Sequence, residues 1–371
     1  MKGIDVFDDL SAQPLILNHN RVKRAYVGGK LLDQWQGIEP ATDNHYPEEF
    51  LISTVEVTNE DRYPGEGLST VTLPDGQEVP LRDIIASNPP DFLGQRFGQR
   101  EEPGLGVLAR VCDTIVRHVI QAHPDQAHAR KYLNFPSGKT EAWYILNSRT
   151  IDGQTPHAYV GFKEGVTRAH WERLFETQDV QGMLEALHKV DVETGNVLLI
   201  EAGMPHAIGP GSMFLEVHEP SDYTFRLEKK YLDRVFTDQE IHYGIGLEGL
   251  FDGFHYDTYS ADEIVEKVFI TPQLLATDGK SQHYTLITYQ HTPRFAMDKY
   301  VVHGAIGISA HSEHRIAVVI SGSGTFHYAS GETPVQQGQG IFLPTGVKDL
   351  TLRSEMGMEV VLAYPPASDA N

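Results

Sequence analysis

Cysteine, long apolar runs and positive charge are all scarce in this 371-residue chain. The single cysteine, Cys112, excludes an intrachain disulfide. No run of about 18 apolar residues occurs, so the sequence does not predict a membrane-spanning helix. The amino-terminal stretch MKGIDVFDDLSAQPLI lacks the basic and then apolar pattern of a signal peptide. Together with the low cysteine count, this predicts a cytoplasmic protein.

Basic residues are outnumbered, since 30 Lys and Arg stand against 51 Asp and Glu, giving a formal net charge of -21. A field of this sign repels nucleic acid and anionic membrane surfaces, so neither is expected as a partner. It also repels an anionic metabolite. A substrate that carries a phosphate would therefore need a local group of Lys or Arg residues to bind it. The sequence does not indicate the oligomeric state.

Short β-branched runs dominate what is present, separated by 34 glycines and 21 prolines. They predict strands at 50–57, 196–202, 283–289, 315–321 and 358–364. One stretch, 167–190, has apolar residues at helical spacing and a plausible N-cap at Thr167. Short helices are also expected within 104–120 and 260–268. The fold class predicted is mainly β with a short helical insertion.

A strand–turn–strand unit occurs twice in the chain. In each copy a glycine opens an apolar strand, a second glycine follows eight residues later, and a third marker residue follows at offset eleven. The two copies are Gly195-Gly203-His206 and Gly338-Gly346-Asp349. This repeat predicts two related β-domains. We place a metal-binding domain with the helical insertion at about 167–190 in residues 1–255, and a metal-free domain in residues 256–371.

Four side chains form a candidate metal site in the first domain. Gln121 and His123, at positions i and i+2 of a predicted strand, face the same side. Glu141 opens an apolar strand, where a carboxylate needs a partner or a cation. His206 lies at the turn of the first repeat. One amide, two imidazoles and one carboxylate suit Zn²⁺ or a similar divalent ion. His118, His128 and His157 are poorer candidates because they lack a nearby acidic or amide partner.

Four motifs in this region resemble those of one family. They are Gln121-Ala122-His123-Pro124-Asp125, then Gly138-Lys139-Thr140-Glu141-Ala142-Trp143-Tyr144, then Ala202-Gly203-Met204-Pro205-His206-Ala207, then Leu215-Glu216 with Ser221-Asp222-Tyr223-Thr224-Phe225-Arg226. In this order they resemble the type I mannose-6-phosphate isomerases, which belong to the cupin superfamily. The resemblance is specific over 121–226 and weaker elsewhere. It implies two cupin, or jelly-roll, barrels.

The resemblance also implies functional roles. Gln121, His123, Glu141 and His206 would bind one Zn²⁺ per chain, Arg226 would be the active-site arginine, and Lys139 and Glu216 would line the same cavity. The implied activity interconverts mannose 6-phosphate and fructose 6-phosphate through an enediol. Either Lys139 or Glu216 could be the general base, if burial shifts its pKa toward neutrality. For the sugar phosphate itself we expect contacts from Arg110, Arg226 and Lys139.

The chain departs from the family pattern at four places. Tyr26-Val27 replaces a tryptophan before a glycine pair, Arg110 replaces a lysine, Glu201 a proline and Asn196 an aspartate. No proposed ligand is lost, but the exact sugar stays open. Three alternatives remain: an isomerase of another sugar phosphate, a non-catalytic sugar-binding cupin, and a cupin metal oxygenase. The last is disfavoured because Gln121 replaces an imidazole and no H-x-H pair exists.

Overall fold

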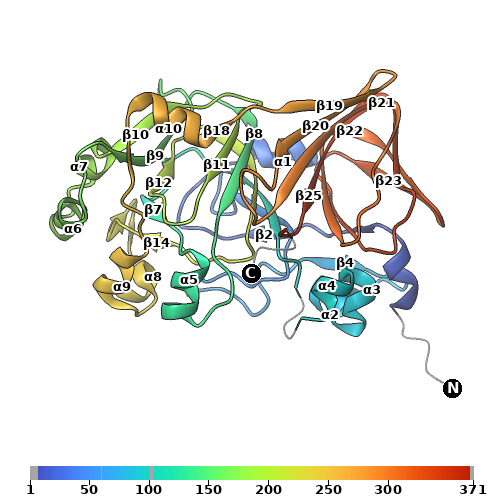
Figure 1. Cartoon of the computed structure of the whole chain (residues 1–371), viewed down its shortest axis with the longest axis horizontal. Coiled ribbons are helices and arrows are strands. Elements are labelled where there is room, and N and C mark those ends of the chain that lie inside the picture. The colour runs from blue at the N-terminus through green and yellow to red at the C-terminus, as the bar shows by residue number, and fades with distance from the viewer. Residues whose placement is uncertain (1–6, 60, 101–103, 368–371) are drawn as a thin grey trace.

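Three large sheets form the framework of the computed structural model, which describes residues 7–59, 61–100 and 104–367 (Figure 1). A seven-stranded sheet and a six-stranded sheet are built from strands between residues 21 and 270. An eight-stranded sheet comes almost wholly from the last third. The expectation of a mainly β protein is therefore confirmed.

The two sheets of the first part carry the predicted site motifs. In hydrogen-bonding order the seven-stranded sheet consists of β18 (Phe269–Ile270), β11 (Val197–Ile200), β8 (Glu141–Ser148), β13 (Ser212–His218), β6 (Leu108–Asp113), β3 (Glu48–Ile52) and β2 (Arg21–Val22). The six-stranded sheet consists of β10 (Leu187–Asp191), β9 (His157–Lys163), β12 (His206–Ile208), β7 (Gln121–Ala122) and β14 (Phe225–Arg226), with β17 (Thr258–Tyr259) on β9.

The remaining strands form the eight-stranded sheet and two small hairpins. The eight-stranded sheet runs β1 (Leu15–Ile16), β24 (Gly340–Leu343), β22 (Arg315–Tyr328), β25 (Thr351–Tyr364), β21 (Ala296–Gly307), β20 (Ser281–Ile287) and β19 (Gln273–Asp278), with β23 (Gly331–Gln336) on β22. The small hairpins are β4 (Thr70–Thr72) with β5 (Glu78–Pro80), and β15 (Lys230–Tyr231) with β16 (Arg234–Val235).

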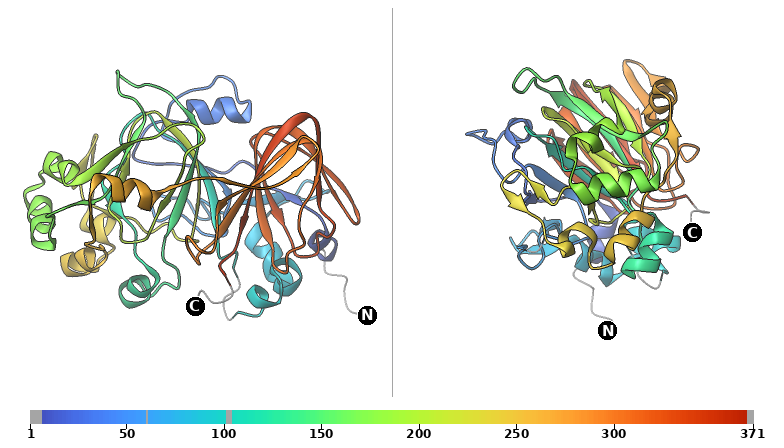
Figure 2. Two further views of the ribbon diagram at one scale, coloured as in Figure 1. Left: turned by 45° about the horizontal axis from the view of Figure 1, so that its top comes forward. Right: turned by 90° about the vertical axis from the view of Figure 1, so that its left-hand side faces the viewer.

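Short helices surround the sheets (Figure 2). They are η1 (Asp8–Ala12), α1 (Lys30–Gln36), α2 (Leu81–Ser87), α3 (Pro89–Leu93), α4 (Gln95–Gly98), α5 (Gln126–His128), η2 (Ala129–Leu133), α6 (Arg168–Thr177), α7 (Val180–Glu185), α8 (Asp238–His242), α9 (Gly246–Asp252) and α10 (Ala261–Val268). None of the helices in the described ranges combines the length and apolar character needed to span a membrane.

The predicted helix at 167–190 is present as two helices and a strand. Thr167 caps α6, because its side chain accepts a hydrogen bond from the amide of His170. The helix ends at Thr177, the following Gln178 adopts a left-handed conformation, and Asp179 then caps α7. The predicted helix at 260–268 is confirmed by α10, which Ser260 caps.

The helix expected within 104–120 is wrong, since this segment contains β6. The run Leu-Ala-Arg-Val-Cys-Asp alternates between two environments. Ala109 and Val111 pack in the core shared with the last third of the chain, whereas Cys112 packs in the core between the first two sheets. This period of two is the spacing of a strand, and pairing with β3 and β13 outweighs the local helical signal.

The same alternation on β8 and β13 gives the seven-stranded sheet two different faces. Ala142, Leu215 and Val217 point outward and join a core that includes Ile316 and Val361 of the eight-stranded sheet. Trp143 and Phe214 point inward and pack with residues of the six-stranded sheet, in a second core. The charged side chains of the predicted site alternate onto this inner face.

Two pairings link the amino- and carboxy-terminal parts of the chain. β1 pairs with β24, so Leu15 and Ile16 extend the eight-stranded sheet. β18, which follows residue 255, pairs with β11 of the seven-stranded sheet. The predicted domain boundary lies between residues 255 and 256. The strands that follow it, β17 and β18, still pair with strands of the first two sheets.

Candidate metal centre

The four predicted ligands come from two sheets that pack face to face. Gln121 on β7 and His206 on β12 are direct cross-strand partners in the six-stranded sheet. His123 follows β7 immediately. Glu141 is the first residue of β8 in the seven-stranded sheet. Three segments far apart in the sequence therefore deliver their side chains to one place between the sheets.

His123, Glu141 and His206 converge closely enough to share one ion. His123 Nε2 lies 3.3 Å from Glu141 Oε2, and His206 Nε2 lies 3.3 Å from Glu141 Oε1. One ligand atom from each of the three residues lies within 4.8 Å of the others. All three side chains are 1% exposed, and neither His123 Nε2 nor Glu141 Oε2 has a hydrogen-bond partner in the described chain. Such buried orphan atoms are costly, and a divalent cation between them would satisfy both.

The two imidazoles are held in the form that binds a metal. His123 Nδ1 donates to the carbonyl of Tyr223 at 2.9 Å, and His206 Nδ1 donates to the carbonyl of Met204 at 2.9 Å. Each Nε2 therefore presents a lone pair toward Glu141, as in sites where an outer carbonyl orients a ligating histidine. Burial lowers the pKa of His123 to about 3, which keeps it neutral.

Gln121 completes the set as a possible fourth ligand. Its Nε2 lies 3.1 Å from His206 Nε2, on the same side as the cluster. Because a half-turn of the amide exchanges nitrogen and oxygen without changing its shape, the oxygen can take this place when a cation is bound. The residues therefore fit a divalent ion with an open coordination position.

Glycines bring the motif segments into contact. Gly138 lies so close to the residues after His123 that an added Cβ would be 2.8 Å from the amide nitrogen of Gln126. The amide of Lys139 donates to the carbonyl of Pro124 at 3.0 Å. Gly203 has a φ of 81° and donates its amide to the carbonyl of His123 at 2.8 Å. Each motif thus holds its neighbour through the backbone.

Lys139 and Glu216 lie beside the cluster. Lys139 Nζ, on a side chain 1% exposed, is 3.7 Å from Glu141 Oε2 and 3.8 Å from Glu216 Oε1. Despite burial, the positive charge of Lys139 helps to hold the pKa of Glu141 well below its ordinary value. Burial, reinforced by the charge of Glu141, outweighs the nearby cations and raises the pKa of Glu216 to about 7.

Arg110 extends this group into a longer buried network. Its Nε and Nη2 donate to the two carboxylate oxygens of Glu216, both at 3.0 Å, across paired strands β6 and β13. Its Nη1 donates to Glu48 at 2.8 Å. Glu48 also contacts Arg24 Nε at 2.9 Å, and Arg24 Nη2 lies 3.0 Å from Asp222. Although burial opposes it, Arg110 and Arg24 lower the pKa of Glu48 to about 2.

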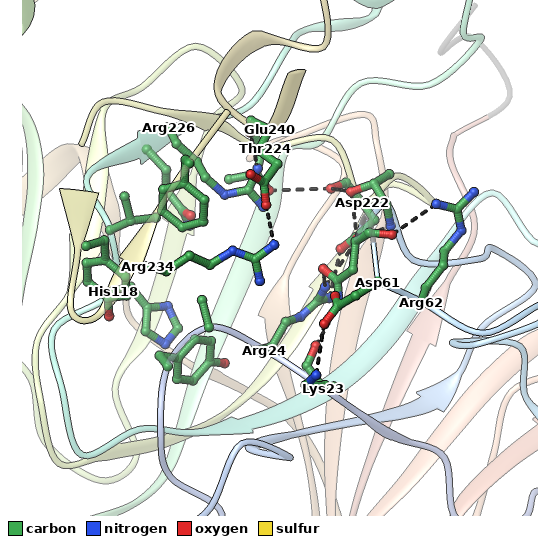
Figure 3. Close-up of a pocket in the computed structure, with 18 of the residues that line it drawn as sticks. Lys23, Arg24, Asp61, Arg62, His118, Asp222, Thr224, Arg226, Arg234 and Glu240 are labelled. Carbon is green, nitrogen blue, oxygen red and sulfur yellow. Dashed lines mark hydrogen bonds and ion pairs between the residues drawn. The ribbon is translucent and has the colours of Figure 1, made fainter. Parts of the chain in front are cut away.

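A cavity of about 270 Å³ opens next to the cluster, and Gln121 is part of its wall (Figure 3). Six of its lining side chains are Lys or Arg and four are Asp or Glu, so the wall is locally positive although the whole chain is strongly negative. The basic residues are Lys23, Arg24, Arg62, Arg110, Arg226 and Arg234. The wall therefore meets the requirement for binding an anionic substrate.

Arg226 has the most available charge near the cluster. It pairs across strands with Gln121, and its guanidinium lies over the ring of Phe236 at 5.3 Å. Its Nη1 donates to the backbone carbonyls of Thr224, at 3.4 Å, and Glu240. Within the described ranges no carboxylate pairs with it, so its positive charge faces the cavity uncompensated.

The structure brings together every residue predicted for the site, and it adds others. Arg110 is more enclosed than expected, because Glu48 and Glu216 already bind its guanidinium. Glu48 and Arg24 were not identified from the sequence. Nothing in their local sequence marks them, since their roles depend on strand pairing. Asp222 lies in the motif that ends at Arg226, and this motif was the sequence signal that could have placed Asp222 near the site.

Known proteins with similar sequence and fold share one description. The family described as "Mannose-6-phosphate isomerase, cupin domain" matches residues 285–364. The chain is 24% identical to the mannose-6-phosphate isomerase of Streptococcus mutans over 342 residues, which is 91% of this chain and 94% of that protein. It is also 24% identical to a mannose-6-phosphate isomerase of Bacillus subtilis over 261 residues, which is 69% of this chain and 74% of that protein.

Solved structures agree with these matches. A crystal structure of mannose 6-phosphate isomerase from Bacillus subtilis superposes with a TM-score of 0.72 at 21% identity, covering 95% of this chain and 99% of that one. A single-residue variant of phosphomannose isomerase from Salmonella typhimurium gives a TM-score of 0.69 at 16% identity, with 96% and 100% covered. These likenesses show the cupin fold, and the resemblance to the mannose-6-phosphate isomerases is confirmed.

We expect His206→Ala to lose its metal, because the substitution removes one of two imidazoles from the cluster. Changes to outer residues alone weaken metal binding by about 10- to 100-fold, so the loss should be at least that large. Metal content after dialysis, measured by mass spectrometry, tests this. His188→Ala is the matched control, since His188 is also buried but binds the carbonyl of Tyr259 instead. Full metal content in His206→Ala would contradict the assignment.

Proposed function

We propose that this chain, a relative of the mannose-6-phosphate isomerases in sequence and fold, is itself a metal-dependent aldose–ketose isomerase that interconverts mannose 6-phosphate and fructose 6-phosphate. One observation carries the proposal. The buried His123–Glu141–His206 cluster adjoins, through Gln121, a cavity with a positive wall in an otherwise acidic protein. A metal ligand set and an anion-binding wall are what a sugar-phosphate isomerase requires.

Zn²⁺ is the ion that the donor set favours, with one ion per chain held by Gln121, His123, Glu141 and His206. Two neutral imidazoles and one carboxylate are common zinc ligands, and an amide oxygen suits a redox-inert ion better than iron chemistry. When bound, the ion would act as a Lewis acid on the sugar oxygens at C1 and C2.

The reaction needs a base that takes the proton from C2 and returns it to C1, while the hydroxyl proton on O2 moves to O1. Lys139 and Glu216 are the two candidates, both buried beside the cluster. We favour Glu216, because a carboxyl with a pKa of about 7 can both accept and release a proton near neutrality. Lys139 then stabilises the ionised carboxylate.

Arg226 would stabilise the enediolate charge. Its guanidinium is pre-positioned by backbone carbonyls and by Phe236, so binding the anion costs little rearrangement. We propose that the substrate phosphate lies at the cavity mouth, near Lys23, Arg62 and Arg234, since these side chains are more exposed than Arg110, which is buried and bound by two carboxylates. Arg110 would then position Glu216 and complete the wall.

The division of the chain into two domains is also part of the proposal. We propose two cupin barrels, the first mainly from residues 1–255 with the metal and the second mainly from 256–371 without one, with β1, β17 and β18 each pairing across this boundary. Asp349, the counterpart of His206 in the sequence repeat, lies in the second part, and the histidine–glutamate cluster of the described chain is wholly in the first. We also keep a cytoplasmic location as a proposal.

An assay with several aldose 6-phosphates, coupled to detection of the ketose product, tests the function. We expect turnover of mannose 6-phosphate that a chelator abolishes and Zn²⁺ restores, because the charge on the sugar oxygens loses its main stabilisation without the ion. Chelator already saturated with metal is the control. A metal-bound protein that is inert toward every hexose phosphate would instead identify a non-catalytic sugar-binding protein.

We expect Arg226→Ala to keep its metal and to lose about 100- to 1,000-fold in kcat, the cost of one preorganised donor to a developing anion. Metal analysis and steady-state kinetics on the same preparation separate the two effects. Arg173→Ala, an exposed arginine on α6, is the control and should retain full activity. If Arg226→Ala lost as much metal as His206→Ala, Arg226 would support the metal ligands rather than the reaction.

The pH dependence of kcat/KM tests the role of Glu216. A base must be ionised, so the rate should rise with pH through the pKa of Glu216, which is about 7 without a metal and lower beside a cation. The rise should therefore lie at or below pH 7 and disappear in Glu216→Gln. Glu266→Gln, exposed on α10, should keep it. An unchanged profile in Glu216→Gln would favour Lys139 as the base.

A further inference from the structure

His118 is a buried histidine in the wall of the substrate cavity that the proposed mechanism does not use. It lies three residues before Gln121 and is 8% exposed. Figure 3 shows its ring on the side of the cavity opposite Arg62. The sequence analysis set His118 aside as a metal ligand, and its nitrogens are indeed not part of the His123–Glu141–His206 cluster.

The backbone of His118 is fixed, but its ring is not hydrogen-bonded. Its amide donates to the carbonyl of Ile208 at 2.8 Å, and its carbonyl accepts from Arg117. The ring packs against Tyr26, with centroids 4.1 Å apart, and against Phe214 at 6.4 Å. Within the described chain no hydrogen bond is made by either ring nitrogen, and Nε2 is a buried orphan.

The described neighbours of the ring do not relieve this deficit. The hydroxyl of Tyr26, the polar group of the packed rings, donates to Glu48 at 2.7 Å and makes no hydrogen bond with His118. Burial lowers the pKa of His118 to about 3, so the ring is neutral and offers one donor and one acceptor. A buried polar group without a partner costs about 1–3 kcal/mol, and the remaining source of a partner is the cavity itself.

We propose that His118 is a specificity-determining residue that hydrogen-bonds a hydroxyl group of the bound sugar phosphate. The inference rests on the proposed function, which defines what the cavity holds. A sugar hydroxyl both donates and accepts, so it can satisfy a neutral imidazole in either tautomer. His118 makes no contact with a metal ligand and takes no part in the proton transfer.

The chemistry of the substrate limits which hydroxyl this can be. C1 and C2 of a hexose 6-phosphate react next to the cluster, and C6 carries the phosphate. The hydroxyls left for recognition are those on C3, C4 and C5. His118 lines the same cavity as Gln121 and the basic residues, so its ring can contact one of these hydroxyl groups.

Kinetics with 3-deoxy-, 4-deoxy- and 5-deoxymannose 6-phosphate on the intact protein test the inference. One analogue should lose about tenfold in kcat/KM with the wild-type protein, the value of one hydrogen bond. In His118→Leu, KM for mannose 6-phosphate should rise about tenfold with little change in kcat, and the penalty for that same analogue should fall below threefold. His118→Gln, which keeps a donor and an acceptor, should restore part of the discrimination.

His188→Leu is the matched control, because His188 is equally buried, at 8% exposed, but lies outside this cavity. It should leave KM and the analogue pattern unchanged, whereas a merely structural role of His118 would lower activity with all substrates alike. If His118→Leu had the same KM for mannose 6-phosphate as the wild-type protein, or kept the penalty for the deoxy analogue, the inference would be overturned and the proposed function would stand. Absence of turnover by the wild-type protein would overturn the proposed function and this inference with it. If His118→Leu does not fold, the wild-type protein still tests the inference. A loss of less than threefold in kcat/KM with all three deoxy analogues would overturn it.

Discussion

Compensation of buried charge is the constraint on which the site depends. Four carboxylates and three cations are enclosed between the first two sheets, with side chains at most 10% exposed: Glu48, Glu141, Glu216 and Asp222 against Arg24, Arg110 and Lys139. Each charge is costly unless it is paired. The carboxylates of this set outnumber the cations by one, and Glu141 Oε2 has no hydrogen-bond partner in the described chain. A cation at this point would offset the excess negative charge and bind that oxygen.

Strand alternation explains how one sheet serves two purposes. On β6, β8 and β13, one set of side chains forms an apolar core with the eight-stranded sheet, and the alternate set carries the charged groups and Trp143. A shift of one residue in register would exchange these faces and bury charge in the apolar core. The large shared core therefore stabilises the register that aligns Glu216 with Arg110 and Glu141 with the histidines.

Recognition of the substrate is a local property set against the global charge. The protein as a whole repels anions, yet its cavity has more basic than acidic side chains. Most of these are neutralised in pairs, whereas Arg226 is held by backbone carbonyls and pairs with no carboxylate of the described residues. A neutral His118 in the same wall adds a contact that is sensitive to hydroxyl position but not to charge.

The sequence by itself determined the mainly β class, most strands of the last third, the capped helices α6 and α10, and the histidines and glutamate that meet in the buried cluster. These features depend on short-range periods, on caps, and on motifs whose spacing can be read directly. Local pattern could not exclude a helix over the segment that contains β6, because pairing with β3 and β13 overrides it. Tertiary structure alone decided that Glu48 and Arg24 join the network, that Arg110 is bound by two carboxylates, and that His118 faces the cavity without a partner. Such roles arise only when distant strands come into register, since a side chain's charge and hydrogen-bonding state depend on neighbours that the linear sequence does not place beside it.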